Sequence, residues 1–360
     1  MRRAPSISAA QFFGTAFGCR AALTIALNGR WAAGENLLDG AFSCLGAMGL
    51  GLLLALPVGL LFRRCPDQPI GEQAVQLFGQ GGKAVSLCYL AYFLVMNGVS
   101  LGLFQLFLQD NVPLDFPAFF ILAAAVGAAL YGAWRGLETV ARAGSCVLVL
   151  LLLGTALVFA LACRRFRWEN LQPPLENGLS PLAGGAAVFL SRTTLFGEMA
   201  VLLPFVRGRR GMGFTLWAGG TSLFVGVLVV LLAGCLGPYA ATQHFPVYAL
   251  ASLTEITSLQ RLDGVFTGVW MMGLTIQTAV SLSACRVCAG SLQRGRETLW
   301  MAGAALAMLV LGGAAAQAPA AQSLFLDTGL WLGLTVLTGA GLPLLVLAVK
   351  RFKAKRRRRP

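Results

Sequence analysis

Charged side chains are scarce in this sequence: Asp, Glu, Lys and Arg make up only 12% of its 360 residues. A soluble domain carries about a quarter. The scarcity excludes an ordinary soluble enzyme, a disordered chain and a nucleic-acid-binding module. The nine cysteines are odd in number and lie mostly within apolar stretches, which does not favour a secreted disulfide framework.

Motifs for catalysis and metal binding are also missing. The sequence contains no nucleotide-binding loop and no Ser/His/Asp arrangement, and it has a single histidine. Cys285 and Cys288 form one C-x-x-C string, but a zinc site needs further ligands at suitable spacing. We interpret this string as small residues at a helix interface. We therefore expect no enzymatic activity, no cofactor, no metal and no nucleic-acid partner.

Apolar sequence is abundant, because hydrophobic residues make up 57% of the chain. A bilayer core of about 30 Å needs about 20 apolar residues per helix. Ten stretches of about this length occur, and we interpret the first of them as a span rather than a cleaved signal peptide. The ten predicted spans are residues 8–28, 37–62, 84–108, 116–134, 143–163, 181–206, 214–236, 265–289, 299–316 and 323–349.

The lysines and arginines indicate the orientation of these spans. With ten spans both termini lie on one side, and 21 of the 28 basic residues fall in segments on that side. Five fall on the other side, three of them in the cluster Arg164, Arg165 and Arg167. The positive-inside rule therefore predicts that both termini are cytoplasmic. The tail at 350–360 is the most basic segment, and we interpret it as a cytoplasmic anchor for anionic membrane lipids.

The ten spans divide into two halves of five. Halves of five spans are inverted relative to each other, and many transporters are built from such repeats around discontinuous helices. We expect one all-α integral membrane domain over 1–349, with repeat one at about 8–163 and repeat two at about 181–349. The first span carries Gly14, Gly18 and Arg20, and the sixth carries a polar patch at 191–194, so we expect both to be broken.

Three charged residues lie within the first and sixth spans: Arg20, Arg192 and Glu198. A charge inside a membrane span costs about 2.5–3.5 kcal/mol on insertion scales, so it is a functional candidate by default. Six residues rotate a helix by about 600°, so Arg192 and Glu198 face different sides unless the helix unwinds between them. Arg20 is then a candidate partner for Glu198. Structural pairing or snorkelling is the alternative for each charge.

Several strings in this order resemble the permease-like B subunit of spore nutrient-germinant receptors. They are ISAAQ at 7–11, YGAWRGLETVAR at 131–142, NLQP at 170–173, GLSP at 178–181, GGA at 184–186, FGE at 196–198, FPVY at 245–248 and QRLD at 260–263. The resemblance covers about residues 7–290. It implies the fold of amino acid-polyamine-organocation transporters, residence in the endospore inner membrane, and a complex with A-type and C-type subunits.

The function implied by this resemblance is binding of a small nutrient, often an amino acid. The receptor would then signal germination with its partners by opening an ion path. We place the ligand site at the broken spans, with Arg20, Arg192, Thr193, Thr194, Gly197 and Glu198. The outer loop at 245–263 is expected to form a lid helix with Pro246 and Tyr248. An independent proton- or sodium-coupled amino-acid permease and a non-binding assembly scaffold remain as alternatives.

Overall fold

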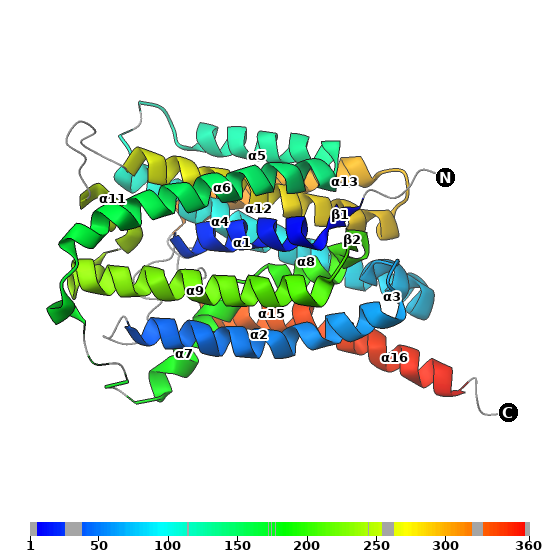
Figure 1. The fold of residues 1–360 in the computed structure, drawn as a ribbon. Coiled ribbons are helices and arrows are strands. Elements are labelled where there is room, and N and C mark those ends of the chain that lie inside the picture. Colours follow the sequence, from blue (N-terminus) through cyan, green and yellow to red (C-terminus); the bar gives the residue numbers. More distant parts are fainter. Residues whose placement is uncertain are drawn as a thin grey trace.

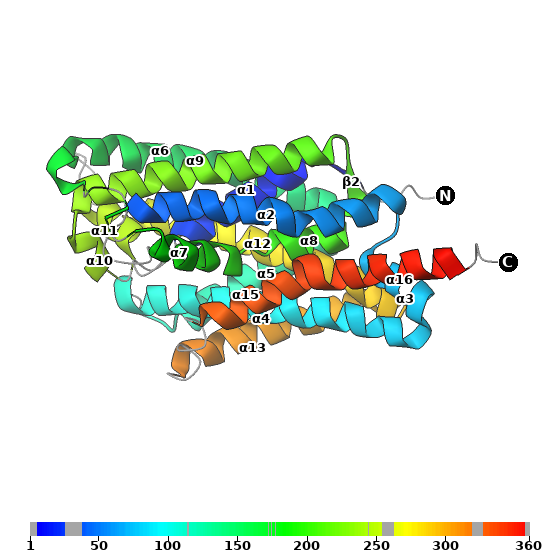
Figure 2. The same cartoon turned by 90° about the horizontal axis from the view of Figure 1, so that it is seen from below.

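Long helices lie side by side along one axis of the molecule, and the N- and C-terminal ends of the chain lie at the same end of it (Figures 1 and 2). We call this the terminal end and the opposite one the distal end. The structure is a computed structural model that describes residues 6–25, 38–113, 115–171, 173, 175–176, 178–243, 245–253, 263–318 and 327–356.

The helices follow the predicted spans closely. The first half contains α1 (Ala9–Ile25), α2 (Leu38–Arg64), α4 (Lys83–Asn111), α5 (Phe119–Arg135) and α6 (Leu137–Ala162). The second half contains α7 (Ser180–Ser191), α8 (Leu195–Leu202), α9 (Arg210–Leu236), α12 (Asp263–Leu292), α13 (Glu297–Gln317), α15 (Thr328–Val336) and α16 (Leu342–Arg356). A π-helical turn, Leu337–Gly341, joins the last two.

Within the described residues, eight of the predicted spans are long and apolar enough to cross a membrane. Seven are continuous segments, and the bent pair α7 and α8 makes the eighth. The other two positions are taken by the 17-residue helices α1 and α5. The predicted all-helical membrane architecture is therefore confirmed. The first span shows no break over Ala9–Ile25, and its predicted end at Asn28 lies outside the described residues.

Helix α1 lies inside the bundle. It packs against α6, α9 and α12, and Figure 1 shows it running between α6 and α9. Its contact with α12 is close, because a Cβ added at Gly273 would lie 2.3 Å from the Cβ of Ala22. Small residues at such positions let membrane helices approach closely without a hydrophobic driving force between them.

Short elements close the ends of the bundle. At the terminal end lie α3 (Ile70–Phe78) and the parallel pair β1 (Ile7–Ser8) and β2 (Val206–Arg207) (Figure 1). At the distal end lie α10 (Tyr239–Thr242), α11 (Pro246–Leu253) and the 3₁₀ turns Cys163–Arg165 and Trp168–Asn170. Helix α3 lies between the second and third predicted spans, is amphipathic and buries Ile70, Gln73 and Ala74.

The last helix runs past the predicted start of the basic tail at residue 350, as far as Arg356. Lys350 Nζ donates hydrogen bonds to Gln73 Oε1 at 2.6 Å and to Cys65 Sγ at 3.0 Å. Lys353 Nζ donates to the carbonyl of Leu77. Figure 2 shows α16 beside α3. The first basic residues of the tail therefore attach the final span to α3.

Candidate functional site

The sixth span is broken where the sequence predicts. Helix α7 ends at Ser191, α8 begins at Leu195, and the two axes are bent by 41°. Two hydroxyls bond back to the last turn of α7: Ser191 Oγ donates to Val188 O at 2.7 Å and Thr193 Oγ1 to Phe189 O at 2.9 Å. Such side-chain bonds compete with the helical backbone bonds. They explain why the helix ends here.

The side chain of Arg20 on α1 caps the C-terminal end of α7. Its Nη2 donates to Phe189 O at 2.8 Å and its Nη1 to Arg192 O at 3.1 Å. The last carbonyls of a helix have no partner within that helix and carry a partial negative charge. A buried guanidinium supplies both the donors and the opposite charge. The suggested pairing of Arg20 with Glu198 is wrong, because these two described side chains form no ion pair and Arg20 bonds to backbone carbonyls.

Glu198 instead accepts a hydrogen bond from Gln277 Nε2 at 2.8 Å. The same amide lies 2.8 Å from Thr194 Oγ1 and 3.4 Å from Ser281 Oγ. Glu198 is only 2% exposed and lies in the first turn of α8, where the helix dipole stabilises a negative charge. Gln277 was not among the predicted site residues. The polar positions 275, 277, 278 and 281 in the eighth span were the available signal.

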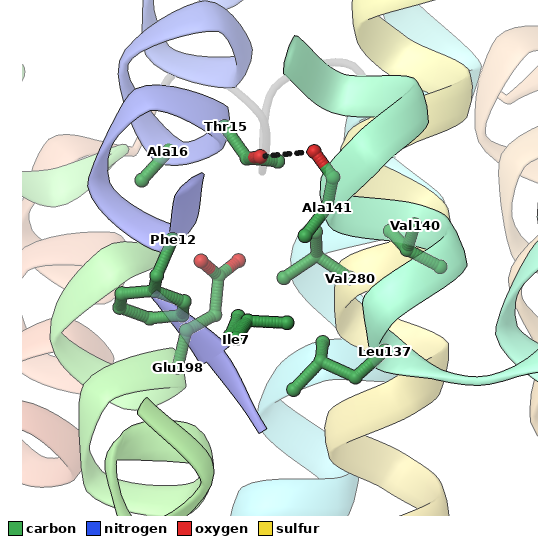
Figure 3. A pocket seen from close by; sticks show the side chains of 9 residues that line it. All are labelled: Ile7, Phe12, Thr15, Ala16, Leu137, Val140, Ala141, Glu198 and Val280. Carbon is green, nitrogen blue, oxygen red and sulfur yellow. Dashed lines mark hydrogen bonds between the residues drawn. The ribbon is translucent and has the colours of Figure 1, made fainter. Parts of the chain in front are cut away.

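The hydrogen bonds of Arg20, Thr194, Glu198 and Gln277 form a layer of polar contacts across the bundle. Two pockets lie on opposite sides of this layer. The distal pocket is lined by Leu23, Met96, Val99, Ser100, Leu103, Arg192, Thr194, Trp270 and Trp331. The terminal-end pocket is lined by Ile7, Phe12, Thr15, Ala16, Leu137, Val140, Ala141, Glu198 and Val280, and Figure 3 shows the Glu198 carboxylate directed into it. Their volumes are about 30 and 10 Å³, which is room for one or two water molecules. Both of these pockets are therefore narrow next to the break.

The comparisons with known proteins identify the family. The spore permease family, described as spore germination protein, matches residues 6–311. The chain belongs to this family. Among curated relatives, the spore germination protein YndE of Bacillus subtilis (strain 168) is 21% identical to this spore permease over 248 residues. The match covers 66% of this chain and 67% of YndE.

Solved transporters share the fold of this spore permease. A substrate-bound, outward-open Na⁺-coupled sialic acid symporter is 13% identical, with a TM-score of 0.65, covering 93% of this chain and 79% of the symporter. MhsT in complex with L-phenylalanine is 18% identical, with a TM-score of 0.63. The match covers 96% of this chain and 99% of the MhsT chain. The predicted transporter fold, of the LeuT type, is therefore confirmed. The family is transporter-like and is not an enzyme family.

The predicted lid segment forms α11 at the distal end. Tyr248 donates from its hydroxyl to Asn111 O at 3.2 Å, and its ring lies 5.1 Å from that of Phe107. Phe107 in turn lies 4.6 Å from Trp270, which lines the distal pocket. Pro246 is buried at the first position of α11, where the missing N–H costs nothing. Aromatic contacts thus connect the lid to the pocket, and residues 254–262 of the predicted loop lie outside the described residues.

Gly197 is one of the positions where an added side chain would clash with a neighbouring helix. A Cβ added there would lie 2.7 Å from Cε1 of Tyr92 on α4. We expect Gly197→Ala to lower the free energy of unfolding by about 1–3 kcal/mol, because the tight packing must shift. Thermal unfolding in detergent measures this. Gly127→Ala, where an added Cβ meets nothing within 4 Å, is the control. An equal melting temperature for both variants contradicts the expectation.

Proposed function

We propose that this spore permease is the membrane subunit of a nutrient-germinant receptor in the endospore inner membrane. It binds a small α-amino acid at the α7–α8 break and signals germination with A-type and C-type subunits, with ion release as the outcome. The observation that carries the proposal is a helix break with three charged residues: Arg20 on the carbonyls at the end of α7, Arg192 on the distal pocket and Glu198 on the terminal-end pocket. Charges inside a membrane mark ligand and ion pathways.

The lining of the distal pocket supports an amino-acid ligand. Arg192 and Thr194 form its polar edge, and Trp270 and Trp331 belong to its apolar wall. In this proposal the ligand carboxylate binds Arg192 and the first amide groups of α8, which have no partner in their own helix. The Glu198 carboxylate faces the terminal-end pocket and is joined through Gln277 to Thr194 at the edge of the distal pocket, so in this proposal its charge acts on the ligand through these hydrogen bonds. The pocket must widen to admit the ligand.

Ligand-induced thermal stabilisation of the purified receptor complex tests the proposal. We expect one or a few amino acids to raise the melting temperature and nucleosides not to do so. Binding to the folded state alone adds about 2.7 kcal/mol of stability at a ligand concentration of 100 times Kd. The same complex with Arg192→Gln is the control and should lose the shift. A shift that persists in this variant, or no shift with any amino acid, contradicts the proposed site.

An independent proton- or sodium-coupled permease is the second candidate, and the likeness to a Na⁺-coupled symporter favours it. Uptake into liposomes separates the two functions. A permease accumulates a radiolabelled amino acid when the protein alone is reconstituted with an inward Na⁺ or proton gradient. The receptor proposal expects no accumulation by the single chain. A protein that neither binds nor accumulates amino acids would instead be an assembly scaffold.

The orientation proposed here places the terminal end in the cytoplasm. We expect a membrane-impermeant thiol reagent added from outside to label Glu176→Cys and not Arg294→Cys. Both positions are exposed, and they lie on opposite sides in the proposed topology. The exposed cysteines Cys88, Cys146 and Cys163 are first replaced by serine. Labelling of Arg294→Cys alone would reverse the orientation.

The lid role of α11 predicts an effect on sensitivity rather than on folding. We expect Tyr248→Ala to shift the nutrient concentration for half-maximal germination by about tenfold, because its ring packs on Phe107 beneath the lid. Pro246→Ala should shift it in the same direction. Tyr248→Phe, which loses the bond to Asn111 O but keeps the ring, is the matched control and should shift it less. A parallel fall of protein abundance and response would make the segment purely structural.

A further inference from the structure

An apolar groove opens on the side of the bundle between α2, α6 and α9. Its volume is about 980 Å³, and it is far larger than the two pockets at the break. Leu45, Leu52, Phe159, Leu223 and Val227 are among the residues that line it, and none of its lining residues is charged. Along α9 the lining runs from Thr215 to Leu231, or about 24 Å at 1.5 Å per residue. It therefore spans most of a bilayer core of about 30 Å.

A basic turn closes the distal end of this groove. Cys163 is the last lining residue on the α6 side, and Arg164 and Arg165 follow it directly in an exposed 3₁₀ turn. The turn is fixed to α9: Cys235 Sγ donates to Ala162 O at 3.3 Å, and Arg167 N donates to Gly234 O at 3.0 Å. These contacts lie one helical turn beyond Leu231. The arginines are thus held at the mouth of the groove.

The neighbouring residues put this turn at the level of the lipid headgroups. Trp168 is 76% exposed, and exposed tryptophans gather at the membrane–water interface. Glu169 is the one acidic residue among positions 164–170, so the turn keeps a net positive charge. These arginines also lie on the side that the positive-inside rule leaves poor in basic residues. The topology alone does not account for them.

We propose that the groove and the turn form a binding site for one anionic phospholipid. The acyl chains lie in the groove between α2, α6 and α9, and the headgroup phosphate binds Arg164 and Arg165. Charge complementarity favours this occupant over a transmembrane helix of a partner. Anionic headgroups attract basic residues next to a span by about 1 kcal/mol each, and they occupy the depth at which the turn lies. This site is independent of the nutrient site proposed above.

Lipid retention by the purified full-length chain tests the site. The protein in detergent is mixed with equal amounts of phosphatidylglycerol and phosphatidylcholine of identical acyl chains, and bound lipids are counted by native mass spectrometry. We expect wild type to retain at least fivefold more phosphatidylglycerol than phosphatidylcholine. Arg164→Gln/Arg165→Gln should abolish this preference. Arg294→Gln/Arg351→Gln, exposed arginines at the terminal end, should keep it.

A second variant tests the groove itself. A Cβ added at Gly226, which lines the groove, meets nothing within 4 Å, so Gly226→Phe fills the groove without a clash of its Cβ. We expect it to lower retention of both lipids at least fivefold. Gly303→Phe on α13 is the matched control, because its Cβ also meets nothing within 4 Å.

Three results would overturn the proposal. One is equal retention of the two lipids by wild type, which indicates annular lipid only. Another is unchanged retention in both the arginine and the Gly226 variants. The third is a dimer mass in wild type that is lost in Gly226→Phe, because the groove would then be an interface between two copies of the chain.

Discussion

Glu198→Gln is expected to leave the protein in the membrane and to raise the nutrient concentration for half-maximal germination at least tenfold. Glutamine keeps the size of the side chain but removes its charge. A hydrogen bond to a charged group contributes about 1.5–3 kcal/mol and a neutral one about 0.5–1.5 kcal/mol, and a difference of 1.4 kcal/mol is tenfold. Germination dose–response curves, with immunoblots of membrane abundance, measure the effect. Glu169→Gln, an exposed carboxylate at the distal end, is the control.

The partner of Glu198 gives a second test of the same site. Gln277→Met removes the donor that reaches the carboxylate at 2.8 Å while keeping the chain length. We expect it to reduce the response to a similar extent, and the double variant to be no worse than either single one, because contacting residues are not additive. A normal dose–response curve for Glu198→Gln at normal abundance would remove the carboxylate from the proposed site.

Arg20→Gln is expected to destabilise the protein by about 2–4 kcal/mol. Two carbonyls at the end of α7 lose a charged donor, at about 1.5–3 kcal/mol each, and relief from burying the charge offsets part of this. Thermal unfolding in detergent measures the change. Arg192→Gln is the matched comparison, because its backbone carbonyl still accepts from Arg20. It should keep the melting temperature near wild type and lower the nutrient response.

The opposite pattern would contradict this assignment. If Arg20→Gln melts at the wild-type temperature while its nutrient response falls, the guanidinium acts on the ligand and not on the end of α7. If both arginine variants have a lower melting temperature than wild type, both arginines stabilise the break. The structural role of Arg20 and the ligand-binding role of Arg192 would then not be separate.

Hydropathy and residue type were enough to predict the helical fold and the position of the break. Apolar runs mark the spans because backbone groups in lipid must be satisfied within a helix. The hydroxyl-rich residues 191–194 mark the break because they offer the backbone other partners. The amphipathic helix α3 was not predicted, because nine residues are too few for a membrane span.

The contacts inside the site were harder to predict. Arg20 bonds to main-chain carbonyls, which every residue carries, so no side-chain pattern in the sequence points to them. Glu198 was predicted as the partner of Arg20 only because it carries the opposite charge within a span. Gln277 is uncharged. The sequence predicts the span in which it lies, but not how that helix is rotated about its axis. Which side chains of α12 face α8 is decided by tertiary packing.

The contacts of Arg20 also constrain the order of membrane insertion. Its two acceptors lie 169 and 172 positions further along the chain. A chain made from its N-terminus therefore presents α1 to the lipid long before α7 exists. Until then the arginine bears an insertion cost of about 2.5–3.5 kcal/mol without its partners. Final placement of α1 thus follows synthesis of the sixth span, so the first helix of the chain is secured only after more than half of the predicted spans have been made.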